Sequence, residues 1–464
     1  MSPLNLDRHG VAMPESPLQA PSALPELATK AMQRFSCTGT SCEDTCCKDF
    51  GISIDRDSLE RMRAVVARDP VRKDKVVRLV VLGMSRDANS SQNLVQLDDH
   101  GGCPLMESDG ACGIHRDYGE QILSTTCSIF PRTALAVEGR LEVTGSLACP
   151  ELARLSLLSD DGLDQDPSST PVLTRAYVGK VLNSDPLDLY GSAFSSVRTV
   201  LLRLFERDDY PIGSRMAFAA NLAAQLDDFF GSHRRFSTHA ERLMAKRRLA
   251  AELDAAEDPD ALRSLHEDLQ QFRGGGDAVV SAAVSMLLER RRLTHAPRFG
   301  KMLEGAMTRL QADCLGTAPG EEMNREQTVT SARLWQVDQR RRARLHERSP
   351  GLADRILGRY ARHYILRNPY TDATSLLSYL GRLSSSLAAI RLLWTAMPEL
   401  EAQWEKAPET GADIRVASAS AIHVIQTYTK AVSHHAEFLN AVHQVNDQPG
   451  GATFGRLVLI AKFV

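Results

Sequence analysis

The chain has 464 residues, of which 43% are hydrophobic, and a formal net charge of −3. This length predicts two or three domains with sizeable cores. A slightly acidic chain is not expected to be a general nucleic-acid binder, so we predict no nucleic-acid partner. Two basic runs, Arg290–Arg292 and Arg340–Arg342, fall within helical patterns and are expected to form solvated helix faces.

The first 30 residues form a Pro/Ser-rich segment without hydrophobic periodicity. Such a segment predicts a disordered tail over residues 1–30. A secretion signal would need an apolar stretch of about 7–15 residues, and a membrane helix would need about 20. The sequence contains neither. We therefore expect a cytoplasmic protein with no membrane partner, in a compartment that keeps thiols reduced.

Residues 31–165 predict a small α+β domain built from short elements. Asp55 is placed to cap a helix whose apolar positions run from Leu59 to Val66, and short strands are expected at 51–54 and 94–97. Alternating apolar residues on both sides of a Glu-Gly turn predict a β-hairpin over 133–144. A further helix is expected to open with the proline that follows Cys149.

The remainder of the chain predicts helices. The polar segment Ser159–Pro171 has the composition of a linker. Beyond it, apolar residues recur at helical spacing, for example over 197–204 and 216–223. The expected fold class is mainly α, with the small cysteine-rich α+β domain followed by a large irregular all-helical domain over 172–464 that is expected to recognise a substrate.

Eight of the nine cysteines lie in the first third of the chain. A cysteine that only fills space occurs wherever a small apolar residue fits, so this clustering indicates a shared ligand or disulfides. In a reducing compartment, a metal or iron–sulfur site is the favoured interpretation. The isolated Cys314 is expected to be a packing residue. The predicted metal ligands are Cys37, Cys42, Cys46, Cys47, Cys103, Cys112, Cys127 and Cys149.

The spacing of these cysteines leaves the type of site open. Adjacent residues on an extended backbone point to opposite sides, so the Cys46-Cys47 pair disfavours one simple zinc site. Eight thiolates suit two four-cysteine sites, or one iron–sulfur cluster with additional structural cysteines. The helix that follows Cys149 is expected to lower the pKa of its thiol. His115 is an alternative ligand, although an ordinary histidine is the favoured interpretation.

The order of these motifs resembles that of a known family. Over about residues 31–158, the pattern is similar to the flagellin lysine-N-methylase family of the FliB type, which is related to zinc- or iron-chelating proteins with a CxxCxxCC-type signature. The helical part resembles the family more loosely. The residues that carry the resemblance are Arg34-Phe35-Ser36-Cys37, Gly39, Cys42-Glu43-Asp44, Cys46-Cys47, Ile52-Ser53-Ile54-Asp55, Cys103-Pro104-Leu105, Cys112-Gly113-Ile114-His115, Cys127, Pro131-Arg132 and Cys149-Pro150-Glu151.

The resemblance implies a protein-lysine N-methyltransferase that uses S-adenosylmethionine and holds an iron–sulfur cluster, or alternatively zinc, on these cysteines. Its partner would be a protein substrate, with flagellin as a candidate. The sequence departs from two methyltransferase patterns. It has no strand followed by a Gly-rich turn, and Cys47 directly follows Cys46, unlike the CxxxCxxC pattern of radical S-adenosylmethionine enzymes. The donor site and the choice between polar and radical transfer therefore stay open.

Two other functions fit the same sequence. One is a non-catalytic zinc- or iron-binding protein whose helical domain binds a partner, and the other is an iron–sulfur redox sensor. In a polar methyl transfer the lysine has to lose its proton, which requires a base or a desolvated channel. Glu43, Asp44 and Tyr118 are candidate bases, although for Glu43 and Asp44 a place in a solvent-facing loop or beside the metal is at least as good an interpretation. No catalytic or cofactor-binding residue is assigned.

Three further residues have both a structural and a functional interpretation. Arg132 is a candidate to hold an anionic group, with a structural salt bridge as an equally good account. Tyr360 and Tyr364 share one face of a predicted helix. Core packing is the favoured interpretation for both tyrosines, and a pocket is the alternative.

Overall fold

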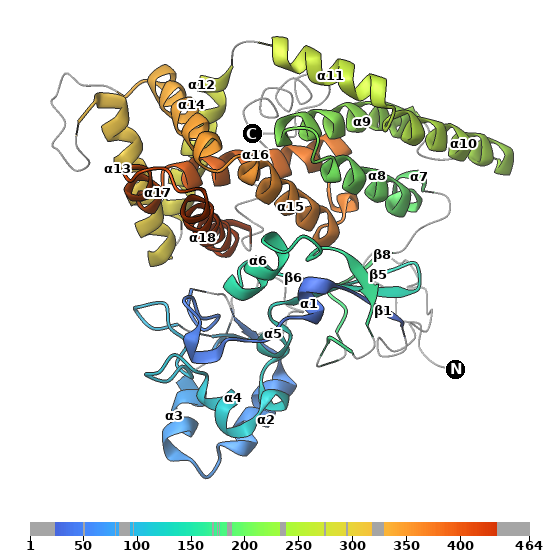
Figure 1. The fold of residues 1–464 in the computed structure, drawn as a ribbon. Coiled ribbons are helices and arrows are strands. Elements are labelled where there is room, and N and C mark those ends of the chain that lie inside the picture. The colour runs from blue at the N-terminus through green and yellow to red at the C-terminus, as the bar shows by residue number, and fades with distance from the viewer. Residues whose placement is uncertain are drawn as a thin grey trace.

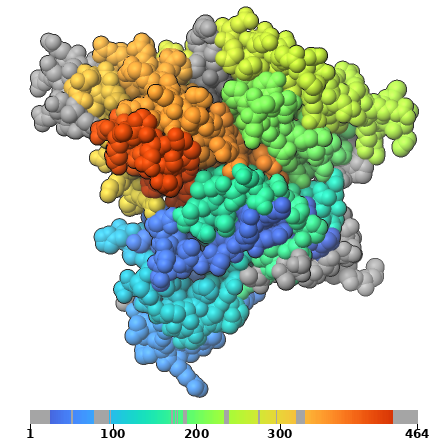
Figure 2. All heavy atoms as spheres, in the orientation of Figure 1, coloured from blue at the N-terminus to red at the C-terminus, as the bar shows by residue number. Residues whose placement is uncertain are grey.

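The computed structural model describes residues 24–49, 52–78, 80–82, 93–95, 97–168, 171–173, 175, 177–182, 188–232, 238–272, 275–293, 296–317 and 329–433. Most of these residues are helical, and two small sheets are formed by strands between residues 26 and 182 (Figure 1). The mainly helical fold is thus as predicted. In Figure 2 the first third of the chain lies below the helices. None of the described helices is both long and apolar enough to cross a membrane.

The larger sheet has five strands in the order β7-β1-β6-β5-β8. Its centre is the predicted hairpin, formed by β5 (Arg132–Val137) and β6 (Arg140–Gly145). Strand β1 (Glu26–Thr29) pairs in parallel with β6. Residues 26–29 were expected to belong to a disordered tail, and this expectation is wrong for them because their backbone is paired in the sheet. Residues 1–23 lie outside the described part of the chain.

The sheet also extends past the predicted domain boundary. Strand β7 (Gln165–Pro167) lies within the segment expected to be a linker and pairs with β1, while β8 (Lys180–Leu182) pairs with β5. Nearby, Nη2 of Arg34 lies 2.7 Å from an oxygen of Asp161. The prediction of a linker is therefore wrong for this segment. An edge strand needs only main-chain pairing and often carries charged residues, so it has no hydrophobic signature in the sequence.

The cysteine-rich region contains the second sheet. Its strands β2 (Ser53–Ile54), β4 (Asn93–Val95) and β3 (Val80–Leu82) are antiparallel. Asp55 caps α2 (Arg56–Val65), as predicted, by accepting a hydrogen bond of 2.8 Å from the Ser58 amide. The helices α3 (Pro70–Arg78), α4 (Gly113–Tyr118) and α5 (Thr125–Ile129) complete this part. The cysteine-rich region has a small core of its own, in which apolar side chains of α2 and α4 pack around Cys103.

The helical part begins at residue 189 and contains the buried faces that the sequence predicts. Val197 and Leu204 of α8 and Met216 of α9 are buried in one large core. The helices are α7 (Leu189–Ser192), α8 (Phe194–Glu206), α9 (Ile212–Ser232), α10 (His239–Ala255), α11 (Pro259–Gln271), α12 (Gly276–Arg292), α13 (Pro297–Leu315), α14 (Ser331–Arg348), α15 (Leu352–Arg367), α16 (Leu376–Thr395), α17 (Pro398–Trp404) and α18 (Thr410–Tyr428), followed by the π-helical turn η5 (Thr429–Ser433).

The larger sheet and the helices share that large core. The helix α6 (Pro150–Leu157), which begins after Cys149 as predicted, packs against α15 and α18. Leu135 and Val137 of β5 join the same apolar cluster as α8 and α9. A buried ion pair adds to this contact, since Nη2 of Arg198 in α8 donates to Glu142 of β6 at 2.8 Å. The larger sheet and the helical part are therefore packed against each other.

Two arginines of the basic runs are buried, which corrects the prediction of solvated faces. Arg290 is 3% exposed and donates from Nε to the Ala431 carbonyl. Arg341 is 5% exposed and forms ion pairs with Asp313 and Glu401. Each guanidinium thus joins its own helix to another segment. The charges are paired or hydrogen-bonded, which is the condition under which arginine is buried.

Candidate functional site

The eight N-terminal cysteines gather in two places. All of them are free, and so is Cys314. One thiol group surrounds the buried Cys103 in the small core, and we call it the inner thiol group. It consists of Cys46, Cys47, Cys103, Cys112 and Cys127. The other, the outer thiol group, consists of Cys37, Cys42 and Cys149.

Backbone contacts place the inner thiol group. The Cys103 amide donates to the Cys47 carbonyl at 2.8 Å, so two segments that are far apart in the sequence run side by side. Cys112 directly precedes α4, and Cys127 lies in the first turn of α5. The Cys127 amide donates to the capping hydroxyl of Ser124 at 3.2 Å. Short capped helices and one strand-like contact therefore bring these thiols together.

Four of the inner thiols, those of Cys47, Cys103, Cys112 and Cys127, have pKa values raised above the ordinary value of a thiol. A hydrogen bond with Cys112 lowers the pKa of Cys47, but the hydrogen bond with Cys46 and burial outweigh it and raise that pKa to about 12. The hydrogen bond with Cys47, together with burial, raises the pKa of Cys112 well above its ordinary value. Burial raises the pKa of Cys103 and of Cys127 to about 12. Metal binding at these thiols would therefore release protons.

Cys149 shows how burial can outweigh a helix N-terminus. It is the N-cap of α6, as predicted. Burial raises the pKa of Cys149 to about 11, although the amides of Leu152 and Glu151 lower it through hydrogen bonds. The expectation of a lowered pKa is therefore wrong in direction, because the cost of desolvating a thiolate exceeds the stabilisation by two amides at this position.

The donor atoms suit a metal centre, but their arrangement is not that of a closed site. Thiolates are the ligands that zinc and iron–sulfur clusters take. Within the described ranges, no group of three or more Cys, His, Asp or Glu side chains is arranged so that it could hold a metal ion. His115 is exposed and Cys314 packs beside the large helical core. The assignment of the eight cysteines as ligands thus stays a prediction.

The candidate bases beside the cysteines make structural contacts. Burial raises the pKa of Glu43, but the hydrogen bond from Arg154 and further favourable contacts outweigh it and hold that pKa below its ordinary value. Asp44 is buried and accepts hydrogen bonds from Nζ of Lys430 at 2.8 Å and from Nε2 of Gln426 at 2.6 Å. The guanidinium of Arg72 lies 6.0 Å from the ring centre of Tyr118. Glu43 and Asp44 thus form structural ion pairs, and Asp44 is buried rather than facing solvent as the loop interpretation expected.

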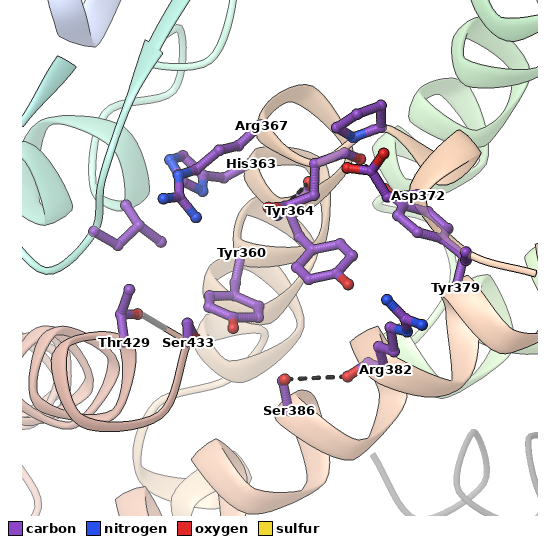
Figure 3. A pocket seen from close by; sticks show the side chains of 14 residues that line it. Tyr360, His363, Tyr364, Arg367, Asp372, Tyr379, Arg382, Ser386, Thr429 and Ser433 are labelled. Atoms are coloured by element: carbon purple, nitrogen blue, oxygen red, sulfur yellow. Dashed lines mark hydrogen bonds between the residues drawn. The ribbon is translucent and has the colours of Figure 1, made fainter. Parts of the chain in front are cut away.

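A second candidate site is a cavity of about 210 Å³ in the helical part (Figure 3). Residues of α15, α16 and η5 line it, and Tyr360 and Tyr364 are among them. The favoured interpretation of these two tyrosines as core residues is thus incomplete, since both also face a pocket. The lining residues are Leu147, Tyr360, His363, Tyr364, Arg367, Asn368, Pro369, Asp372, Ala373, Tyr379, Arg382, Ser386, Thr429 and Ser433.

The cavity contains a neutral histidine and a paired acid. His363 donates from Nε2 to the Gly145 carbonyl at 2.8 Å, and burial lowers the pKa of His363 to about 3. Asp372 forms an ion pair with Lys180. The hydroxyl of Tyr379 donates to the Asn368 carbonyl at 2.8 Å. Each of these side chains therefore has a partner, and together they contribute little net charge to the cavity.

Two arginines of the cavity differ from the rest. Arg367 and Arg382 are half-buried, and their Nε atoms are enclosed without a hydrogen-bond partner. Neither guanidinium forms a hydrogen bond or an ion pair with any residue that the structure describes. In Figure 3 they lie on different sides of the cavity, with the rings of Tyr360 and Tyr364 between them. Among the residues that the structure describes, the positive charge of these two arginines therefore has no counter-charge.

The end of α18 and the turn η5 join the cavity to the region of the outer thiols. Gln426, near the end of α18, donates to Asp44 at 2.6 Å and to the Ala148 carbonyl at 2.9 Å, next to Cys149. Thr429 and Ser433 of η5 line the cavity. Single π-helical turns occur frequently at functional sites. The end of α18 therefore contacts both the cysteine region and the cavity.

Comparison with known proteins decides the family. The profile of the FliB lysine N-methylase C-terminal domain matches residues 198–459, which is more than half of the chain. The chain belongs to the FliB lysine N-methylase family. The match includes the cavity residues of α15, α16 and η5 in this FliB-type protein.

Curated relatives agree with this assignment. The Lysine-N-methylase of Salmonella typhimurium is 30% identical over 184 residues, which cover 37% of this chain and 44% of the relative. That of Salmonella choleraesuis is 30% identical over 183 residues, with the same coverage. The Flagellar biosynthetic protein FliU of Salmonella muenchen is 30% identical over 133 residues, 28% of this chain and 75% of the relative. The match thus spans less than half the length of the two lysine methylases. No solved structure matches the chain.

The cavity was largely hidden in the sequence. The spacing of Tyr360 and Tyr364 was the one signal, because positions four apart share a helix face. Arg382 and Thr429 come from other helices, and only tertiary packing brings them to α15. Arginines within the largely buried helix α16, which contains Arg382 and Arg391, are a further signal that could have indicated a polar cavity.

Proposed function

We propose that this FliB-type protein is a protein-lysine N-methyltransferase that uses S-adenosylmethionine as the methyl donor. The match of the FliB lysine N-methylase C-terminal domain to residues 198–459 carries this proposal. Two relatives bear the name Lysine-N-methylase and a third is named for flagellar biosynthesis. A protein substrate follows from this activity, with flagellin as the first candidate and the helical part as the region that recognises it.

The cysteines are proposed to hold an iron–sulfur cluster, with zinc as the alternative. Cys47, Cys103, Cys112 and Cys127 would form one set of four ligands, since all four belong to the inner thiol group. The outer thiol group of Cys37, Cys42 and Cys149, together with Cys46 of the inner thiol group, would supply the rest. When bound, an iron–sulfur cluster supplies one-electron chemistry, whereas zinc in an all-cysteine site is structural.

The two acidic residues beside the cysteines, Glu43 and Asp44, are poorly suited to act as a general base. A lysine that attacks a methyl group has to be neutral. Glu43 and Asp44 are held by cations, and proton uptake by either carboxylate would weaken its pair with Arg154 or Lys430. We therefore propose that desolvation lowers the pKa of the acceptor lysine, so that its ammonium group gives its proton to water, rather than to one of these acids, before the methyl group is transferred.

Two measurements test the proposed function. Anaerobically purified protein is analysed for metal and acid-labile sulfide, and iron with sulfide would support the cluster, while about two zinc ions per chain would favour a structural centre. The same protein is incubated with labelled S-adenosylmethionine and flagellin or lysate protein. Transfer of label to protein supports the methyltransferase. The absence of transfer by protein that contains its metal would contradict it.

A further inference from the structure

The two arginines of the cavity approach it from different sides. Arg367 of α15 and Arg382 of α16 have the rings of Tyr360 and Tyr364 between them (Figure 3), so they do not converge on a single small anion. Neither has an ion-pair partner among the residues that the structure describes, and burial lowers the pKa of Arg367. A half-buried guanidinium without a counter-charge is costly. Each arginine therefore calls for an anionic partner of its own.

A buried hydroxyl in the same cavity also lacks a partner. Thr429 of η5 is 5% exposed and lines the cavity, and its Oγ1 atom has no hydrogen-bond partner among the described residues. In Figure 3 it lies on the same side of the Tyr360 ring as Arg367. Buried polar groups are nearly always hydrogen-bonded, so an unpaired one indicates a missing partner. An anion bound by Arg367 would bring an acceptor to that side of the cavity.

The lining disfavours cationic ligands. Its acidic residue, Asp372, forms an ion pair with Lys180. An ammonium group would therefore meet two guanidinium groups and no free carboxylate among the described lining residues. Like charges at short range repel most strongly where water is excluded. The acceptor lysine is thus expected to bind elsewhere, and so is S-adenosylmethionine, whose sulfonium and ammonium groups are both cationic.

The wall between the two arginines is aromatic. Tyr360 and Tyr364 present their rings there, and the rings of Tyr364 and Tyr379 have centroids 5.3 Å apart. Ligand sites typically combine such walls with a few polar groups that fix orientation. The cavity volume of about 210 Å³ is below the range of about 300–1,000 Å³ that is usual for drug-sized ligands. A short apolar chain with one anionic group at each end therefore suits this space.

We propose that this cavity binds a small dicarboxylate, with one carboxylate on Arg367 and the Thr429 hydroxyl and the other carboxylate on Arg382. Arginine suits this role because its planar fork of donors matches a carboxylate. The rings of Tyr360 and Tyr364 pack against the carbon chain between the two carboxylates. The dicarboxylate is a third ligand, besides the methyl donor and the acceptor protein, and its site does not rest on the proposed function.

Calorimetry of the full-length protein with matched acids tests this site. Succinate, glutarate and adipate differ in length, and butyrate, pentanoate and hexanoate are the monocarboxylates with the same numbers of carbon atoms. We expect one dicarboxylate to bind at least about tenfold more tightly than its matched monocarboxylate, since one charge-assisted contact accounts for a difference of this order. Arg367→Gln and Arg382→Gln should each remove that difference. Arg362→Gln, on the same helix as Arg367 but paired with Glu206 outside the cavity, should bind as the wild type does.

Thr429→Val keeps the test decisive if the arginine variants do not fold. It removes a hydroxyl that has no partner in the free protein, so the free energy of unfolding should not fall, while dicarboxylate binding should weaken several-fold. Equal binding of dicarboxylates and monocarboxylates by the wild type, or unchanged binding in the arginine and threonine variants, would overturn the proposal. So would inorganic phosphate that binds as tightly as every dicarboxylate, because it would indicate separate ion sites. Displacement of the dicarboxylate by S-adenosylhomocysteine would assign the cavity to the methyl donor and would also overturn it.

Discussion

Lys430 and Asp44 are 386 positions apart in the sequence, yet Nζ of the lysine lies 2.8 Å from a carboxylate oxygen of the aspartate. Both side chains are 7% exposed. The same carboxylate accepts a hydrogen bond from Gln426, one helical turn earlier. The loop that carries Cys42, Cys46 and Cys47 is therefore held directly by the end of the helical part, next to the cavity.

Removal of the Asp44 carboxylate should destabilise the protein strongly. Asp44→Ala leaves the Lys430 ammonium buried without its counter-charge, so we expect the free energy of unfolding to fall by about 3–5 kcal/mol. Glu43→Ala is the matched control, because its pair with Arg154 is more than a third exposed and should contribute less than about 1 kcal/mol. Urea denaturation of the three proteins measures both effects. Equal losses for the two variants would contradict this account of the Asp44 contact.

Substitutions at the adjacent cysteines should reduce bound metal. We expect Cys46→Ser and Cys47→Ser each to lower metal content and solubility, because the loss of a ligand also removes folding free energy. Cys314→Ser should retain the metal content of the wild type, since Cys314 packs beside the helical core. Elemental analysis of anaerobically purified proteins provides the comparison. Normal metal content in both adjacent variants would show that these two residues are not ligands.

The buried histidine should make stability depend on pH. Burial lowers the pKa of His363 to about 3 in the folded state, from an ordinary value of 6.5. Between these values the unfolded chain binds one more proton, so stability is fully present above the ordinary pKa and falls as the pH drops through this window. The slope from this residue approaches about 1.4 kcal/mol per pH unit. His363→Gln, which keeps a donor for the Gly145 carbonyl, should reduce the slope between pH 6.5 and pH 5, and an unchanged slope would contradict the neutral buried form.

The turn of the β5–β6 hairpin offers a stabilising substitution. Glu138 and Gly139 have φ angles of 48° and 77°, which are the left-handed values of a tight hairpin turn. Asparagine adopts this conformation more readily than glutamate, so Glu138→Asn should raise stability by roughly 0.5 kcal/mol after the loss of the exposed contact with Ser195. Gly139→Ala should lower it by about 1 kcal/mol. Thermal denaturation shows whether each variant is more or less stable than the wild type. A stabilising Gly139→Ala would refute the turn geometry.

Local patterns predicted the local elements well. The cap at Asp55, the hairpin around Glu138-Gly139 and the helix after Cys149 each depend on neighbours within a few residues, and the structure contains all three. Features that depend on distant partners were missed. Glu26–Thr29 forms a strand because the distant strands β6 and β7 pair with it, and the buried Arg290 donates a hydrogen bond to the distant Ala431 carbonyl.

The candidate sites show the same difference between local patterns, which the sequence reveals, and contacts with distant residues, which it does not. Clustering in the sequence indicated that the eight cysteines act together, but their division into two thiol groups depends on how the segment around Cys103 lies against Cys47. The raised pKa of Cys149 depends on burial, which the helix N-terminus alone did not reveal. The arginine pair of the cavity required the packing of α15 against α16, because no local pattern joins Arg367 to Arg382.

The central claim is that this FliB-type protein methylates lysine side chains of a protein. Its most direct test is mass spectrometry of flagellin after incubation with anaerobically purified protein and S-adenosylmethionine. We predict methyl groups on lysine residues that appear only when the donor is present and that decrease with Cys47→Ser. Flagellin and total lysate protein that both remain unmodified, with protein that contains its metal, would contradict the claim.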